Sequence, residues 1–231
     1  MPSKISNAKH WIFDLDNTLY PPGCNLFHQI DIRMREFIAR YFDIELDEAF
    51  LLQKRYFREF GTTLNGLMKN HGMEPDDFLH YVHDIDVSVI DPNPALDKAL
   101  ANLPGRKVIY TNGSLVHAER ISNRLGIAHH FDAIFDIVAA EFMPKPDIRA
   151  YRSLLVEYAI DPKGAVMVED VARNLEPAKQ LGMETVLIHT EHRWSEDASD
   201  AGFVDHRIDD LTAWLVALVE GEITKEADSA A

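Results

Sequence analysis

Two acidic residues stand two positions apart, directly after a short apolar segment near the start of the chain. Asp14 and Asp16 follow residues 11–13, which are Trp, Ile and Phe. Ligands bind beyond the carboxyl ends of the strands in open parallel sheets, so a strand that ends in this way predicts an anionic site there. Carboxylate oxygens favour Mg²⁺ over zinc as the cation at such a site. Taken alone, the same residues also suit an ordinary turn.

A second acidic pair, Glu169-Asp170, ends the apolar segment 165–168 in the same way. If both strands belong to one parallel sheet, these carboxylates meet the first pair at one edge, where their repulsion requires a metal ion or a proton. Asn174 lies about one helical turn beyond Asp170 and faces the same point if the helix begins there. The two pairs together weigh against the turn interpretation.

Two further positions carry groups that bind anions. Thr111 and Asn112 follow the apolar segment 108–110, and a hydroxyl with backbone amides at a helix start forms an anion cradle. The alternative for this segment is only an N-cap for the next helix. Lys145 stands between two prolines, and such a lysine is usually solvated. Beside a carboxylate cluster, however, its ammonium offsets the negative charge and holds a phosphate oxygen.

The elements that position these residues alternate along most of the chain. Alternating buried strands and helices imply a parallel sheet with helices on both faces, so the predicted fold class is α/β. Strands are expected over 11–13, 108–110, 133–138, 165–168 and 185–188, and helices over 115–125, 148–158 and 175–181. Ser114 and Asp147 are the expected N-caps, and Gly126 and Gly182 the expected C-terminal glycines.

Residues 21–93 interrupt this alternation with helical patterns alone. The expected helices are 27–41, 50–60 after the N-cap Asp47, 64–68 and 78–82. Asn93-Pro94 then restarts the α/β pattern with an N-cap and a proline at the first helical position. We therefore predict an α/β core formed by residues 1–20 and 94–231, with a helical domain over 21–93 inserted after the first strand.

Composition limits the classes of partner and the location. The chain has 231 residues, 46% of them hydrophobic, and a formal net charge of −15. The hydrophobic content suffices for a substantial core, whereas the excess of acids argues against nucleic-acid binding. Cys24 is the single cysteine, which excludes an intrachain disulfide and favours a cytoplasmic location. The most apolar stretch, 211–219, is far shorter than the roughly 20 residues that span a bilayer, so no membrane partner is expected.

Histidines occur in two small groups. His80 and His83 are three residues apart, and His129 and His130 are adjacent. Because no carboxylate or cysteine in the sequence completes either group, solvated or packing roles are expected for them. No chemistry is assigned to Cys24.

The order and spacing of four motifs resemble those of the haloacid dehalogenase (HAD) superfamily. The motifs are Asp14-x-Asp16-x-Thr18, Thr111-Asn112, Lys145 and Glu169-Asp170, and they span most of the chain. The resemblance implies a Rossmann-like doubly wound core, and the helical insertion is similar to the C1 cap of that superfamily. Within it, the segments 14–21, 60–67 and 168–175 look like the pyrimidine 5′-nucleotidase branch.

The resemblance also implies a role for each motif residue. Asp14 is the expected nucleophile and forms an aspartyl-phosphate, while Asp16 protonates the leaving group and then deprotonates the hydrolytic water. Mg²⁺ is held by the Asp14 side chain, the Asp16 main-chain carbonyl and Asp170, with Glu169 and Asn174 in the outer shell.

Other roles concern the substrate itself. By the same resemblance, Thr111 and Lys145 hold the phosphoryl oxygens where charge accumulates, and Asn112 is expected to bind substrate. On the helical domain, the candidates for leaving-group recognition are Arg55, Tyr56, Gly61, Thr62 and Thr63. The alternative for these helical-domain residues is ordinary surface and core.

The expected function is therefore Mg²⁺-dependent hydrolysis of a small phosphorylated metabolite by a monomer or homodimer. A pyrimidine nucleoside monophosphate such as UMP or CMP is the expected substrate. A phosphosugar or phosphoglycolate remains an alternative, because the core motifs specify the reaction and not the leaving group. A carbon–halogen hydrolase needs no second carboxylate in the first motif, so Asp16 argues against it. A non-enzymatic phospho-acceptor module is compact, so the helical insertion disfavours it.

Overall fold

The computed structural model describes residues 4–189 and 202–229 and contains a six-stranded parallel sheet. The strand order is β3-β2-β1-β4-β5-β6, and every adjacent pair is parallel. From β1 the chain adds β2 and β3 on one side and then β4, β5 and β6 on the other, so the carboxyl ends of β1 and β4 form a topological switch point. The predicted doubly wound α/β fold is confirmed. The strands are β1 (His10–Phe13), β2 (Arg106–Tyr110), β3 (Ala133–Phe135), β4 (Ala165–Glu169), β5 (Glu184–Ile188) and β6 (His206–Ile208).

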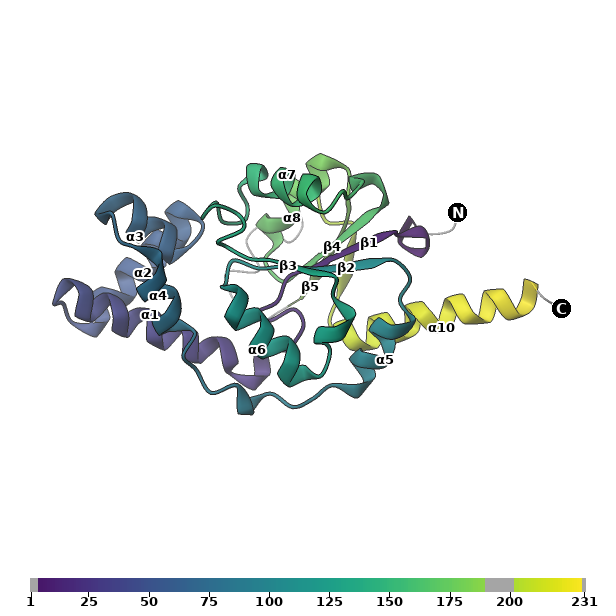
Figure 1. The fold of residues 1–231 in the computed structure, drawn as a ribbon, viewed down its shortest axis with the longest axis horizontal. Helices are drawn as coiled ribbons and strands as arrows, with labels where there is room; N and C mark the ends of the chain where they lie inside the picture. The colour runs from purple at the N-terminus through teal and green to yellow at the C-terminus, as the bar shows by residue number, and fades with distance from the viewer. Residues whose placement is uncertain (1–3, 190–201, 230–231) are drawn as a thin grey trace.

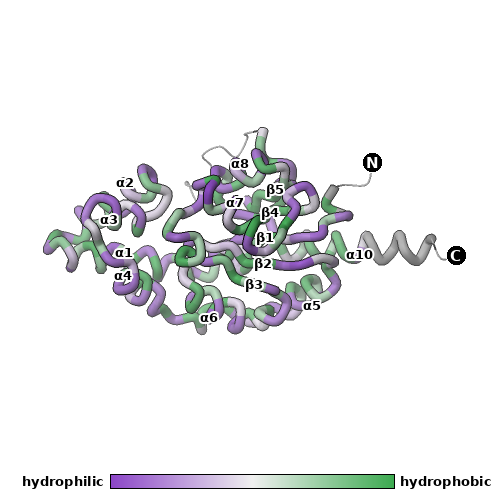
Figure 2. The backbone as a smooth tube through the Cα atoms, turned by 45° about the horizontal axis from the view of Figure 1, so that its top comes forward, coloured by the Kyte–Doolittle hydropathy of each residue, from purple (hydrophilic) through white to green (hydrophobic). Residues whose placement is uncertain are grey.

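Helices cover both faces of the sheet (Figure 1). Side chains alternate along β1, so Trp11 and Phe13 join one hydrophobic cluster and Ile12 joins the other. Figure 2 shows hydrophobic residues along the central strands and mixed character along the surrounding helices. One face carries α5 (Pro94–Asn102), α6 (Leu115–Leu125) and α10 (Leu211–Ser229), and the other carries α7 (Ile148–Glu157) and α8 (Ala172–Leu181).

Four helices between β1 and α5 pack together beside the sheet (Figure 1). Aromatic side chains join them, as between Phe37 and Phe78, whose ring centroids are 5.2 Å apart. Thr62 begins the third of these helices by accepting a hydrogen bond from the Asn65 amide. The helices are α1 (Leu26–Phe42), α2 (Leu46–Phe60), α3 (Thr63–His71) and α4 (Pro75–Val82). Division of the chain into two domains at residues 20 and 93 stays a prediction.

The predicted helix caps agree with the structure except at one position, although α2, α3, α4 and α8 are longer than predicted. The side chains of Ser114 and Asp147 cap α6 and α7, and Gly126 and Gly182 end α6 and α8 in the left-handed conformation. Asp47 is not an N-cap, because α2 begins at Leu46; Asp47 lies in its first turn, where a carboxylate favours the helix dipole.

Two predictions about strands were incomplete. Strand β3 stops at Phe135 instead of reaching residue 138, and β6 was not predicted. β6 is short, pairs only with β5 and is at most half buried, so it lacks the apolar run that marks the other strands. The short 3-10 helices are Lys4–Asn7, Pro22–Cys24, Val87–Val89, Ala128–His130 and Pro162–Gly164. Within the described residues, no helix has the length and apolar character needed to span a membrane.

Candidate active site

The acidic motifs meet at the switch point of the sheet because β1 and β4 are neighbours. Phe13 pairs with Val168, and the amide of Asp14 donates to the carbonyl of Val168 at 2.9 Å. Carboxylate oxygens of Asp14, Glu169 and Asp170 lie within 4.8 Å of one another, and all three residues are buried. The structure thus brings together acids that are more than 150 residues apart in sequence.

Lys145 lies inside this acidic cluster and not in solvent. Its ammonium donates to Asp14 Oδ1 at 2.5 Å, to Glu169 Oε1 at 2.7 Å and to the Tyr110 carbonyl at 3.1 Å. Asn174 Nδ2 donates to the same Glu169 oxygen at 2.6 Å, and the Val171 amide donates to Glu169 Oε2. Both oxygens of the Glu169 carboxylate therefore accept hydrogen bonds from neighbouring donors, and both Glu169 and Asp170 line the cavity.

Burial governs the protonation of these groups. Burial raises the pKa of Asp14 to about 7, with Glu169 acting in the same direction and Lys145 opposing it. The pKa of Asp170 is also raised, first by burial and then by Glu169 and Asp14. Although burial alone lowers it, the pKa of Lys145 is held above its usual value by Asp14 and Glu169. Without a cation the cluster thus resists full ionisation.

A divalent cation fits this donor set. Three carboxylates face one ammonium, so negative charge is in excess when all are ionised, and hard oxygen ligands suit Mg²⁺. Asp14, Glu169, Asp170 and Asn174 all line the cavity, and Asn174 donates a hydrogen bond to Glu169.

Asp16 is held by two side chains, and neither contact was predicted from the sequence. Tyr20 Oη donates to Asp16 Oδ1 at 2.5 Å, and His117 Nε2 lies 2.8 Å from the same oxygen. Burial favours the neutral acid, but His117 and Tyr20 keep the pKa of Asp16 below its usual value. His117 comes from the first turn of α6, three residues after the N-cap Ser114, and this position beside the site was the signal available in the sequence.

Thr111 and Asn112, predicted to bind anions and substrate, also belong to the site. Thr111 is buried, and its hydroxyl oxygen accepts from the Gly113 amide at 2.9 Å. Asn112 Oδ1 accepts from the Lys145 amide at 2.9 Å, so it joins the second motif to the third. Thr18 Oγ1 donates to Asp14 Oδ2 at 3.3 Å. Both Thr111 and Asn112 line the cavity beside Asp14.

A cavity of about 730 Å³ lies over the acidic cluster, between the sheet edge and helices α1–α4. Gly61, Thr62 and Thr63 line it, as the sequence analysis expected of leaving-group candidates. Arg55 and Tyr56 are not among its lining residues in the described chain; Arg55 is exposed, and the Tyr56 hydroxyl lies 2.6 Å from His71 Nε2 between α2 and α3. The remaining wall from the helices is mainly apolar and includes Phe27, Ile30, Met34, Phe50, Phe57, Phe78, Leu79 and Val82.

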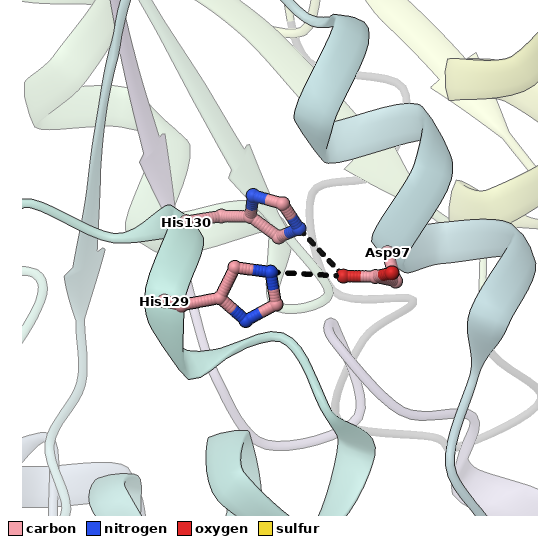
Figure 3. A group of neighbouring side chains, drawn as sticks. All are labelled: Asp97, His129 and His130. Atoms are coloured by element: carbon pink, nitrogen blue, oxygen red, sulfur yellow. Dashed lines mark hydrogen bonds and ion pairs between the residues drawn. The ribbon is translucent and has the colours of Figure 1, made fainter.

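One expectation about histidines was wrong. A carboxylate does complete the adjacent pair, because Asp97 Oδ1 on α5 lies 3.2 Å from His129 Nε2 and 2.7 Å from His130 Nε2 (Figure 3). Asp97 is 32 residues earlier in the chain, so spacing along the sequence did not indicate the contact. The group links α5 to the 3-10 helix Ala128–His130, and none of its residues lines the cavity.

The fold and the acidic cluster define an α/β protein with a carboxylate site at the switch point of its sheet and helices above that site. Residues 8–182 match the family described as haloacid dehalogenase-like hydrolase, and the chain belongs to this family of enzymes. It is 29% identical to phosphate metabolism protein 8 of Saccharomyces cerevisiae over 90% of this chain and 69% of that protein. It is 28% identical to the glyceraldehyde 3-phosphate phosphatase of Methanocaldococcus jannaschii, over 87% of this chain and 92% of that protein.

Solved structures of other proteins share this fold. CbbY from Rhodobacter sphaeroides, in complex with phosphate, superposes with a TM-score of 0.63 at 18% identity, covering 89% of this chain and 95% of that one. L-2-haloacid dehalogenase from Xanthobacter autotrophicus superposes with a TM-score of 0.58 at 16% identity, covering 91% and 98%. At these identities the likeness concerns the fold alone.

Proposed function

We propose that the chain is a Mg²⁺-dependent phosphomonoester hydrolase that works through an aspartyl-phosphate. The observation that carries this proposal is the buried cluster in which Lys145 bridges Asp14 and Glu169 while Asp170 stands beside them. The name of the archaeal relative, a glyceraldehyde 3-phosphate phosphatase, supports the same reaction class.

Each residue of the cluster has a task in this reaction. Asp14 attacks phosphorus through its carboxylate, so the bond to the leaving oxygen breaks as the acyl-phosphate bond forms. Lys145 and Thr111 stabilise the negative charge that builds on the phosphoryl oxygens. Asp16 gives a proton to the leaving oxygen and then takes one from the water that hydrolyses the acyl-phosphate.

Asp14, the main-chain carbonyl of Asp16 and Asp170 would hold Mg²⁺, with Glu169 and Asn174 as the outer-shell residues. The cation supplies charge neutralisation that lets an anionic carboxylate approach an anionic phosphoryl group. Lys145 alone offsets only one of the negative charges in the cluster.

We further propose that the substrate is a nucleoside monophosphate of the pyrimidine type, such as UMP or CMP. The cavity wall from α1–α4 carries four phenylalanines, Phe27, Phe50, Phe57 and Phe78, and aromatic faces suit a planar base. The volume of about 730 Å³ lies within the range of small-molecule sites. A sugar phosphate is the second candidate, since one relative bears that activity in its name and CbbY has been solved with xylulose-1,5-bisphosphate.

A panel of phosphomonoesters tests both levels of this proposal. Purified protein with Mg²⁺ is expected to release phosphate from UMP and CMP faster than from glyceraldehyde 3-phosphate or phosphoglycolate, and to lose activity in EDTA. If the sugar phosphate ranks above both nucleotides, the substrate proposal is wrong while the reaction class stands. An Asp14→Asn variant is expected to fold and to lose nearly all turnover; substantial residual turnover contradicts the covalent route.

A further inference from the structure

We propose that His117 is a positioning residue that directs the acid–base carboxyl of Asp16, and that His83, the C-cap residue of α4, protects this contact from water. This inference rests on the proposed phosphomonoesterase function and adds two residues that no motif of the sequence analysis contained in this role.

The two oxygens of Asp16 have different surroundings. Oδ1 receives the Tyr20 hydroxyl at 2.5 Å and lies 2.8 Å from His117 Nε2. No described residue forms a hydrogen bond with Oδ2, although Asp16 lines the cavity and keeps 15% of its side chain exposed. One oxygen is thus fixed to the protein, and the other is free to meet a substrate.

The surroundings of His117 determine which way its hydrogen bond runs. Its side chain is fully buried, and Nδ1 has no hydrogen-bond partner among the described residues. Leaving a buried N–H group without an acceptor costs more free energy than leaving a buried, unprotonated ring nitrogen without a donor. The favoured tautomer therefore carries its proton on Nε2, which makes His117 a donor to Asp16.

With two donors on Oδ1, that oxygen is the poorer site for a proton. Of the two oxygens, Oδ2 is then the one that exchanges a proton with the leaving group and with water, on the side of the cavity. When Asp14 forms its bond to phosphorus, a proton passes through Oδ2 to the leaving oxygen as the phosphorus–oxygen bond breaks, and Asp16 is left as the carboxylate. Hydrolysis of the acyl-phosphate returns a proton from water to Oδ2.

His83 covers the buried imidazole from the side of the helical segment. The two rings are nearly parallel, with centroids 4.4 Å apart, and His83 Nδ1 lies 3.0 Å from Ser114 Oγ. Arg120 of α6 donates to the carbonyls of His83 and Ile85 at 2.7 and 2.8 Å, which holds this end of α4 against α6. The contact between His117 and Asp16 therefore depends on the end of α4 remaining packed against α6.

The dependence of rate on the leaving group tests this role. The phenolate of p-nitrophenyl phosphate departs with little need of a proton, whereas the alkoxide of a nucleoside monophosphate needs one. His117→Phe keeps the ring stacked on His83 but removes the donor. We expect it to lower kcat for the nucleotide by about tenfold or more, part of the range that general acid catalysis supplies, and to affect the nitrophenyl ester much less.

Two variants and one measurement keep the test decisive. His117→Gln restores an N–H near the position of Nε2 and is expected to recover part of the kcat for the nucleotide. His80→Phe, on the exposed side of α4, is the matched control and should leave both esters unchanged. Circular dichroism of each variant verifies folding. Equal losses on both esters, or no gain from glutamine, overturn the positioning role; a wild-type protein inactive on every phosphomonoester overturns the proposed function itself.

Discussion

At the scale of single residues, Lys145 is the group on which the acidic cluster depends. Its side chain is 2% exposed, and it forms ion pairs with Asp14 and Glu169, whose side chains are 8% and 1% exposed. Removing one partner from such a buried pair leaves a charge without compensation, which typically costs about 3–5 kcal/mol. Lys145 therefore contributes to the stability of the fold as well as to the proposed binding of phosphate.

Lys145→Met is expected to lower the free energy of unfolding by an amount of that order, about 3 kcal/mol, and to abolish turnover. Urea unfolding measures the first effect and phosphate release the second. Lys163→Met, at an exposed lysine in the segment before β4, serves as the control and should be close to neutral. Unfolding of Lys145→Met at the wild-type urea concentration would show that the ion pairs contribute nothing.

The raised pKa of Asp14 predicts a pH dependence of stability in the absence of metal. Burial shifts this pKa from 3.8 to about 7, so between these values the folded protein binds more protons than the unfolded chain. Stability due to Asp14 is therefore present below pH 3.8 and is lost as the pH rises to about 7. In EDTA, the free energy of unfolding of the wild type minus that of Asp14→Asn should therefore decrease as the pH rises through this window. A difference that stays constant with pH contradicts the shifted pKa.

The acidic residues could be predicted from the sequence because each lies at the end of an apolar segment, and strand ends in a parallel sheet converge. His117 could not be predicted in the same way. Its contact with Asp16 spans 101 positions and depends on how α6 is rotated about its own axis against β1. Tyr20 is four residues from Asp16, but its contact needs the turn after β1 to fold back, which spacing alone does not indicate.

At the scale of elements, the contact between α2 and α3 is unusually close at Gly66. A Cβ atom added there would lie 2.4 Å from Cγ of Tyr56. Tyr56, a candidate for substrate recognition in the sequence analysis, is therefore a packing residue of this helix pair in the structure, with its hydroxyl at His71. The close approach of the α3 backbone at Gly66, and not contact with substrate, accounts for the burial of Tyr56.

Gly66→Ala is expected to destabilise the protein by about 1–3 kcal/mol, because α3 must move away from the tyrosine ring. Gly164→Ala, where the nearest atom would be 3.8 Å away, is the control and should have little effect. Thermal unfolding of both variants gives the comparison. Equal melting temperatures would mean that the helix pair accommodates the methyl group without strain.

Elements with strong apolar runs and clear caps were predictable, as for α6, whose predicted range 115–125 matches Leu115–Leu125. Prediction failed where contacts between distant parts of the chain determine the local structure. β6 is a short, partly polar segment that becomes a strand only by pairing with β5. Asp97, His129 and His130 meet because α5 lies beside a 3-10 helix, an arrangement that the order of elements does not specify.

At the scale of the whole molecule, chemistry and recognition come from different parts of the chain. Helices α1–α4 lie beside the sheet (Figure 1). The sheet side supplies the carboxylates and Lys145, while α1–α4 supply most of the apolar cavity wall. Arg173 of α8 connects the two parts: its guanidinium lies 4.3 Å from the Phe57 ring centroid and donates to the Gly61 carbonyl at 3.4 Å. Changes in the helical wall should therefore alter substrate choice, and changes at the sheet edge should alter the reaction itself.

The stereochemical course at phosphorus tests the central claim most directly. A phosphomonoester whose phosphoryl group carries three distinguishable oxygen isotopes is used with Mg²⁺ to transfer phosphate to an acceptor alcohol, because the ester that forms stays chiral at phosphorus. Attack by Asp14 followed by attack of the alcohol makes two in-line displacements, so the account predicts net retention of configuration. Net inversion would mean one direct displacement by the alcohol and would contradict an aspartyl-phosphate at Asp14.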